Sequence, residues 1–434
     1  MSLNKLPKWI PVLFVISAFG PYLSTSLGLR VEHLIIYPMV FGLLFLYILQ
    51  PQPFGRHSFI VFNLWLVMTT YFVLRTVLDS QRTAPLTRVI SGAENFIQPL
   101  GILFVLIMMH KLATGEEIQE RMLRTFRIIV ILLCVNSIWS LISIAVDTTA
   151  INVLFWGGEG SVSSRAITNG RFSGIFNQPM EAGVAYSIGS LLWLYLMNFK
   201  SKVKSIDIFK MLLLAVGGLL TVSKIFLFGG IPLFLLGVLM NKKVRAATLK
   251  VLTVATLLGT AAYYFFLKTW TGLEYLLRFF GSNQDFITLL TAGRFGAGAQ
   301  QADLFEVAWN KNWIIGQGFG AYDIYDSAYF NIFANGGTLG MILYVSFLLA
   351  LLFMALGYLN RFGITPETKL FAGVVILVIF AGFGSPVFIL NRVSIILWVT
   401  LGLLLQRINT MNAERKTKKA FDITTVKNRQ AQLT

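Results

Sequence analysis

The sequence has few of the residues that carry metal or redox chemistry. It contains one cysteine, Cys134, inside an apolar run, which excludes a disulfide framework and a thiolate metal site. The three histidines, His33, His57 and His110, show no metal-ligand spacing. We therefore expect neither a metal nor a cofactor.

Charged residues are also scarce. They make up 13% of the chain, whereas hydrophobic residues make up 56% and the mean hydropathy is +0.71. A water-soluble globular protein of 434 residues could not carry so much apolar material on its surface. The composition excludes a soluble protein and predicts a polytopic integral membrane protein.

Apolar segments long enough to cross about 30 Å of hydrocarbon recur along the chain. They predict an all-α bundle of about 12 transmembrane helices over residues 1–406, the first retained and not cleaved as a signal peptide. The basic tail, 407–434, is predicted to be disordered and attracted to anionic lipid. The predicted spans lie near 9–27, 33–50, 58–74, 90–110, 126–146, 179–198, 207–222, 225–240, 247–267, 328–357, 368–384 and 387–406, and an interfacial helix is expected over 114–127.

Lysine and arginine are distributed unevenly between the two predicted faces. The positive-inside rule places both termini in the cytoplasm, because most of the basic residues then face inward. Twelve remain on the outer face, and most of these are arginines, whose planar guanidinium suits phosphate. Membrane-surface snorkelling and salt bridges are the alternative roles. The twelve are Arg30, Arg75, Arg82, Arg88, Arg165, Arg171, Lys224, Lys268, Arg278, Arg294, Lys311 and Arg392.

Two long outer segments, near 147–178 and 268–327, are predicted to form loops and short helices over the bundle. In the first, Arg171 precedes a glycine-containing turn, and Asn177 and Pro179 stand where a helix should begin. Glu181 falls in the first turn of that helix. An arginine beside a helix N-terminus has the form of an anion site, although plain helix capping explains the pattern equally well.

A second polar feature interrupts a hydrophobic hairpin at Ser223 and Lys224. The outer turn between the seventh and eighth predicted helices contains both residues. A lysine there is costly unless it reaches water or an anion, so either snorkelling or ligand binding is expected.

The second outer segment is the richest in polar groups. Arg294 begins a predicted amphipathic helix, and the glycines near 316–320 are expected to form a flexible connection. Asp326 and Tyr329 follow at i and i+3, so they share one helical face at the mouth of the tenth span. Asp326 could cap that helix or act as a base.

In their order and spacing, these motifs resemble the O-antigen polymerase and ligase superfamily, most closely a Wzy-type polysaccharide polymerase, over residues 170–345. The resemblance implies a GT-C-type glycosyltransferase of the bacterial inner membrane that joins undecaprenyl-pyrophosphate-linked oligosaccharides on the periplasmic face. Arg171 and Arg294 match the family's arginines, whereas Lys224 stands where relatives often have arginine. Asp326 and Ser327 replace a His-Asn pair of the ligases, which disfavours a ligase.

The expected reaction is attack by a sugar hydroxyl of one lipid-linked unit on the anomeric carbon of another. Arg171, Arg294 and Lys224 would stabilise the leaving pyrophosphate, and Asp326 or Glu181 would accept the proton, with Tyr329 positioning it. Further candidate substrate-binding residues are Ser223, Asn177, Arg165 and Arg278.

The expected partners are the lipid-linked donor and acceptor, the bilayer and a chain-length regulator, with no nucleic acid. A lipid-linked oligosaccharide flippase and a structural scaffold are the competing classes. The absence of a visible repeat disfavours the flippase, and the outward-facing arginines disfavour the scaffold.

Overall fold

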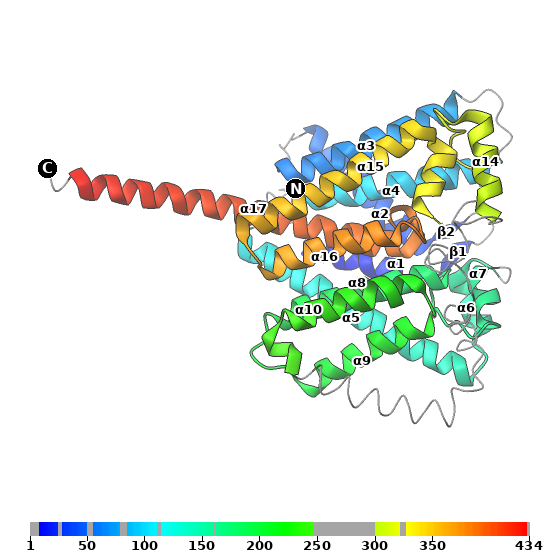
Figure 1. Cartoon of the computed structure of the whole chain (residues 1–434), viewed down its shortest axis with the longest axis horizontal. Coiled ribbons are helices and arrows are strands. Elements are labelled where there is room, and N and C mark those ends of the chain that lie inside the picture. The colour runs from blue at the N-terminus through cyan, green and yellow to red at the C-terminus, as the bar shows by residue number, and fades with distance from the viewer. Residues whose placement is uncertain are drawn as a thin grey trace.

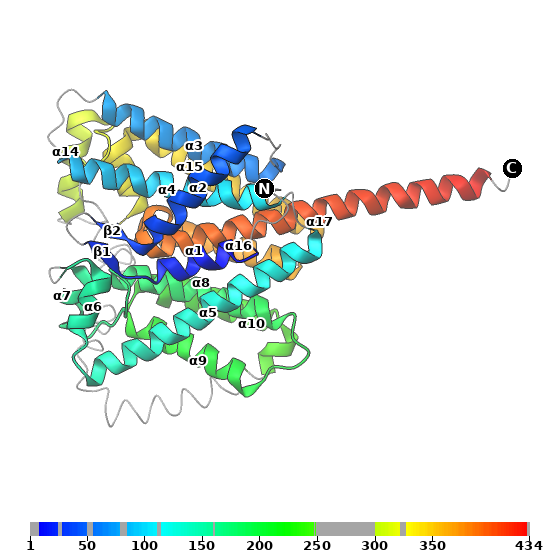
Figure 2. The ribbon, with the colours of Figure 1, turned by 180° about the vertical axis from the view of Figure 1, so that it is seen from behind.

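The computed structural model describes residues 8–24, 28–49, 55–78, 85–110, 114–158, 161–246, 248, 300–321 and 327–431. Helices run side by side along one axis, and the last helix extends far beyond the others (Figure 1). The same arrangement is visible from behind (Figure 2). We call the end of the bundle from which the last helix projects the tail end, and the opposite end the loop end.

The main elements run along the axis that joins these two ends. They are α1 (Ile10–Ala18), α2 (Val31–Leu49), α3 (Arg56–Val77), α4 (Leu86–His110), α5 (Gly115–Ala145), α8 (Pro179–Met197), α9 (Ser205–Leu220), η2 (Ile225–Gly230) with α10 (Ile231–Leu239), α15 (Ala328–Phe362), α16 (Pro366–Ala381) and α17 (Asn391–Ala431). Of these, α1 and α10 have only nine residues each. The shorter elements are β1 (Tyr22–Ser24), β2 (Leu29–Arg30), α6 (Thr149–Trp156), α7 (Val162–Ile167), α14 (Gln300–Asn312) and η4 (Val387–Ile389).

Within the described ranges, seven helices are long and apolar enough to span a membrane, namely α2, α3, α4, α5, α8, α15 and α17. The prediction of an all-α polytopic membrane bundle is confirmed. The shorter helices α1, α9 and α16 and the η2–α10 pair lie among them. The count of twelve stays a prediction, and its ninth span, 247–267, falls almost wholly outside the described residues.

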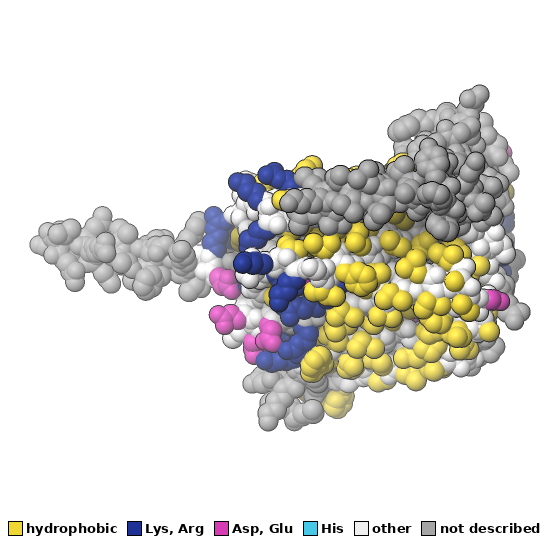
Figure 3. Space-filling view, turned by 90° about the horizontal axis from the view of Figure 1, so that it is seen from below, with side chains coloured by type: hydrophobic (Ala, Val, Ile, Leu, Met, Phe, Trp, Pro, Cys, Tyr) yellow, Lys and Arg dark blue, Asp and Glu magenta, His cyan; other side chains and the backbone are white. Residues whose placement is uncertain are grey.

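The surface agrees with a membrane location. Hydrophobic side chains cover the middle of the face in Figure 3, and Lys and Arg gather at its border nearest α17. On α5, for example, Ile131, Val135 and Ile138 are exposed, whereas the opposite side of the same helix is buried. Such an apolar belt with basic residues at one edge is typical of a multi-pass membrane protein.

Aromatic rings form the centre of the bundle. Trp65 is fully buried and contacts the rings of Phe96, Phe347, Phe388 and Trp398 at centroid distances of 4.8 to 5.6 Å. These five residues come from α3, α4, α15, η4 and α17. One ring cluster therefore fixes elements that are far apart in the sequence.

The prediction of a separate interfacial helix over 114–127 is wrong. This segment is continuous with the following span, and together they form the single helix α5. Thr114 and Glu117 form a capping box at its start, with Glu117 N donating to Thr114 Oγ1 at 3.3 Å and Thr114 N donating to Glu117 Oε2 at 3.0 Å. No glycine or proline follows before Ala145 to end the helix.

The first and last helices also differ from expectation. The helix predicted over 9–27 ends at Ala18, because Gly20 and Pro21 follow and lead into β1, which pairs antiparallel with β2. The tail predicted to be disordered is helical, since α17 continues to Ala431. After Gly402 the sequence has neither glycine nor proline to stop that helix.

Helix α15 breaks at Gly337, whose backbone (φ 60°, ψ −161°) is open essentially to glycine alone. The chain after α14 packs into the break. Thr338 N donates to Trp313 O at 2.7 Å, and Gly318 N donates to Asn335 O at 2.7 Å. The backbone groups freed by the break are therefore satisfied by the connecting segment.

Gly316 shows how tightly this connection is held. Its φ is +66°, and a Cβ built there would lie 2.4 Å from Asn335 O. The glycines near 316–320 therefore allow close backbone packing here, and the predicted flexibility of this connection stays a prediction.

Candidate functional site

The candidate site lies at the loop end, around the chain that leads into α8. The helix begins at Pro179 with Glu181 in its first turn, as predicted. The loop that precedes α8 is hydrogen-bonded to the Asn136 side chain of α5. Ile175 N donates to Asn136 Oδ1 at 2.9 Å, and Asn136 Nδ2 donates to Ser173 O at 3.2 Å. A buried side chain thus fixes the loop conformation.

Arg171 joins this loop to the end of α9. Its Nε donates to Thr221 O at 3.2 Å, and its side chain is half-buried. The next residue, Phe172, donates its backbone N–H to Leu220 O at 2.8 Å. Arg171 is therefore held close to the Ser223-Lys224 turn.

That turn contains the only described non-glycine residue with a positive φ, Val222 at +45°. A β-branched residue there is strained, and such strain is concentrated at functional sites. Ser223 is buried and packs on α8, since a Cβ on Gly183 would lie 2.4 Å from Ser223 Oγ. Lys224 is half-buried and directly precedes η2, a π-helix. π-helices also occur frequently at functional sites.

Asn177 and Glu181 connect the start of α8 to other elements. Glu181 is fully buried, and its two oxygens accept from Asn177 N at 3.1 Å and from Val393 N at 3.3 Å. Asn177 Nδ2 donates to the Tyr22 hydroxyl at 2.8 Å. The carboxylate therefore fixes α8 against α17.

Arg392 of α17 completes this group. It is fully buried and donates to Asn177 Oδ1 and, at 2.8 Å, to Gly20 O. Its guanidinium lies 5.7 Å from the centre of the Tyr22 ring. One cation thus links the chain after α1, the loop before α8 and the beginning of α17.

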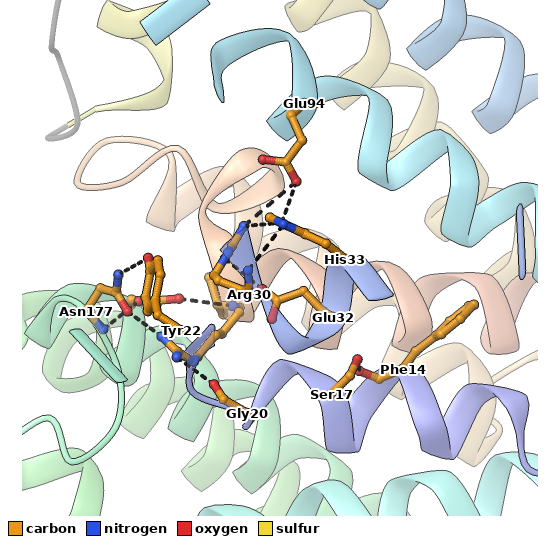
Figure 4. A network of polar contacts seen from close by, with 12 residues as sticks. Phe14, Ser17, Gly20, Tyr22, Arg30, Glu32, His33, Glu94 and Asn177 are labelled. Carbon is orange, nitrogen blue, oxygen red and sulfur yellow. Dashed lines mark hydrogen bonds and ion pairs between the residues drawn. The ribbon is translucent and has the colours of Figure 1, made fainter. Parts of the chain in front are cut away.

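A second group of ionisable residues lies beside the first (Figure 4). Arg30 pairs with Glu32 at 2.8 Å and lies 3.9 Å from Glu94. Glu94 also contacts His33 Nε2 at 3.0 Å and accepts from the Tyr37 hydroxyl at 2.9 Å. Burial by itself lowers the pKa of the Arg30 guanidinium, but Glu32 and Glu94 more than offset this, so the net pKa is raised.

The two groups form one buried ionic network, which we define as Tyr22, Arg30, Glu32, His33, Tyr37, Glu94, Asn177, Glu181 and Arg392. Arg30 and Tyr22 join its halves, with the guanidinium 5.9 Å from the ring centre. It contains three carboxyl groups, two guanidiniums and one imidazole. Ionisable groups inside a helix bundle are costly and usually functional.

Sequence reasoning placed Arg30 and Arg392 in the outer basic set without singling out either, and it did not identify Glu32 or Glu94. Of the roles considered for the outer basic residues, Arg30 has that of a salt-bridge partner, because it pairs with Glu32. The sequence signal that could have revealed this group is the cluster of Arg30, Glu32 and His33 at the start of an apolar span.

The other predicted site residues are spread more widely. Arg165 is exposed in the last turn of α7. The Tyr329 hydroxyl donates to Ile379 O at 2.9 Å, which ties α15 to α16. Arg278, Arg294 and Asp326 lie outside the described residues.

The described geometry therefore joins Arg171, the Ser223-Lys224 turn and the start of α8, and links Asn177 and Glu181 to a buried ionic network. Arg171 and Lys224 are half-buried cations that can hold an anion at the loop end, whereas Arg30 and Arg392 are buried and pair with groups of the protein itself. No family model matches this sequence, and no curated protein matches it.

Proposed function

We propose that this chain polymerises undecaprenyl-pyrophosphate-linked oligosaccharide repeat units into O-antigen or a related surface polysaccharide, as a metal-independent GT-C-type glycosyltransferase. The observation that carries the proposal is the contact of Arg171 Nε with Thr221 O at 3.2 Å across 50 residues of sequence. It brings one of the two candidate arginines to the strained turn that contains Ser223 and Lys224. Arg171 is thereby held beside a turn that contains a second cationic residue, Lys224, and paired cations suit a lipid diphosphate.

In the proposed reaction, a sugar hydroxyl of one lipid-linked unit attacks the anomeric carbon of the glycan carried by another. The bond from that carbon to the pyrophosphate oxygen breaks, and undecaprenyl pyrophosphate leaves with the electron pair. Arg171, Arg294 and Lys224 stabilise the negative charge that grows on this leaving group. One such donor contributes about 3 kcal/mol to transition-state stabilisation.

The hydroxyl proton passes to a carboxylate, for which Asp326 and Glu181 are the candidates. Glu181 already accepts two backbone N–H groups and is fully buried, so it is poorly placed to receive a substrate proton. These contacts favour Asp326 as the base and give Glu181 a positioning role at the start of α8.

The proposed setting is the bacterial inner membrane, with both termini in the cytoplasm and the loop end in the periplasm. The gathering of Lys and Arg toward the tail end supports this orientation through the positive-inside rule (Figure 3). A separate chain-length regulator is proposed as a protein partner.

The test is synthesis by the purified protein, reconstituted with a lipid-linked repeat unit and followed by the size of the product. Arg171→Ala is expected to slow polymer formation roughly a hundredfold, because it removes one charge-stabilising donor. Arg171→Lys is also expected to be poor if phosphate is held through two hydrogen bonds. The matched control is Arg127→Ala, which removes an exposed arginine from α5. Wild-type chain lengths in Arg171→Ala would reject the mechanism.

A flippase for lipid-linked oligosaccharides is the second candidate, and the buried ionic network favours it. Transporters contain buried charged residues, and Glu32 and Arg392 are fully buried here, each in the first turn of its helix at the loop end. Radiolabelled repeat units distinguish the two classes, because bond formation proceeds in detergent whereas transport needs a sealed vesicle. Polymer formed in detergent would support the transferase, and vesicle translocation without any bond formation would support the flippase. A ligase would transfer finished glycan to a different lipid acceptor.

A further inference from the structure

Helix α14 lies across the loop end of the bundle, against the first part of α15 (Figure 1). Phe305, Trp309 and Trp313 recur at every fourth residue and so follow one flank of the helix and its end. The rings of Trp309 and Trp313 stack with centroids 5.4 Å apart, and Phe305 stacks on Phe333 of α15 at 4.9 Å. We call Phe305, Trp309 and Trp313 the aromatic flank.

The aromatic flank is open on its outer side. Trp309 and Trp313 are 46% and 45% exposed, and Ile314 beside them is 48% exposed. The remainder of α14 is amphipathic, because Ala308 is buried against the bundle and Glu306 and Asn310 are exposed. Neighbouring large apolar side chains left open in this way mark a contact surface.

The exposed surface of α15 next to the aromatic flank indicates that lipid covers the flank. Leu339, Ile342, Leu349, Phe353 and Leu356 are exposed along one stripe of α15, with Ile342 55% exposed. The stripe belongs to a membrane-spanning helix, so its occupant is lipid. Leu339 N donates to Ile314 O at 3.0 Å, which makes the aromatic flank continuous with the end of this stripe.

We infer that α14 is an interfacial helix, whose aromatic flank lies among the lipid headgroups of the leaflet at the loop end. Tryptophan favours this depth, because the ring is apolar whereas the indole N–H is polar. Glu306 and Asn310 then face water, as in helices that lie in the plane of a membrane surface. The inference goes beyond the proposed reaction and does not depend on it.

The test uses nitroxide spin labels on the full chain in lipid vesicles. The buried native Cys134 is replaced in a Cys134→Ser background, and single cysteines are placed by Ile314→Cys, Asn310→Cys and Ile342→Cys. Collision rates with oxygen, which concentrates in lipid, and with a nickel chelate, which stays in water, report each label's surroundings. The label at Ile342 provides the lipid reference and the label at Asn310 the aqueous reference.

We expect the nickel-chelate collision rate at position 314 to be severalfold lower than at position 310 and to approach that at 342. Equal nickel-chelate rates at 314 and 310 would overturn the inference. Protection of the label at 314 by soluble oligosaccharide, with no contrast in oxygen collisions, would also overturn it, because the flank would then bind sugar. If Cys134→Ser fails to fold, the wild-type background serves, since Cys134 is buried and labels poorly.

Discussion

Arg392 offers the sharpest test of the structure. Arg392→Met keeps a side chain of similar length in α17 but removes the guanidinium and its hydrogen bonds to Asn177 and to Gly20 O. It also removes a cation that lies close to the fully buried Glu181. The substitution therefore leaves a buried carboxylate with less compensating charge.

The expected loss of stability follows from that uncompensated charge. Removing one partner of a buried charged pair typically costs about 3 to 5 kcal/mol. Ordinary hydrogen bonds between membrane helices contribute much less, about 0.6 kcal/mol on average. A loss of about 3 kcal/mol or more would thus indicate that Arg392 acts through charge compensation and not as one more interhelical hydrogen bond.

The measurement is reversible unfolding of the purified protein in mixed micelles, followed by circular dichroism. Arg127→Met is the control, because Arg127 is exposed on α5, and its expected change is below about 0.5 kcal/mol. The double variant Arg392→Met with Glu181→Gln should be more stable than Arg392→Met alone, because it removes the stranded charge. A loss below about 1 kcal/mol in Arg392→Met, or no recovery in the double variant, would refute the reasoning.

Three further predictions concern the fold and the loop before α8. Gly337→Ala should lower the free energy of unfolding by about 2 kcal/mol or more, because the Gly337 backbone conformation suits only glycine. Gly357→Ala in the same helix is the control and should be neutral, because its Cβ would meet open space, and equal effects of the two changes would contradict the break. Asn136→Leu should cost about 1 to 3 kcal/mol and reduce polymer synthesis, because it frees the loop that holds Arg171, and unchanged protease sensitivity of that loop would oppose this. Trp65→Ala should cost about 3 to 5 kcal/mol, measured by thermal denaturation, and a smaller loss would count against the central ring cluster.

Much of the architecture follows from local sequence patterns. The apolar runs predict the long helices, and Pro179 with Glu181 correctly predicts where α8 begins, because proline and an acidic residue both favour a first helical turn. Helix ends were harder to predict. The charged residues after Thr114 suggested a separate surface helix, yet nothing in the sequence there interrupts a hydrogen-bonded helix, and α5 continues through them.

The candidate site was less predictable, because its contacts join distant segments. The ionisable residues next to Arg30 predict its local pair with Glu32 but not its contact with Glu94. Arg392 has no such sequence context, and its role depends on Asn177, which lies many residues away. Orientation statistics could count these arginines on one face but could not pair them with particular acids. By contrast, the proximity of Arg171 to the Ser223-Lys224 turn agrees with the grouping suggested by motif order.

The break at Gly337 divides α15 into two rods with separate attachments. The first rod is fastened to α16 through Ala328 N, which donates to Gly382 O at 2.8 Å, and through the Tyr329 hydroxyl. The second rod continues toward the tail end as a lipid-facing span. The two rods also touch across the break, because the Tyr344 ring of the second lies 5.8 Å from the Tyr329 ring of the first. The angle between them is therefore set by side-chain packing and by the segment after α14, and not by a continuous ladder of helical hydrogen bonds.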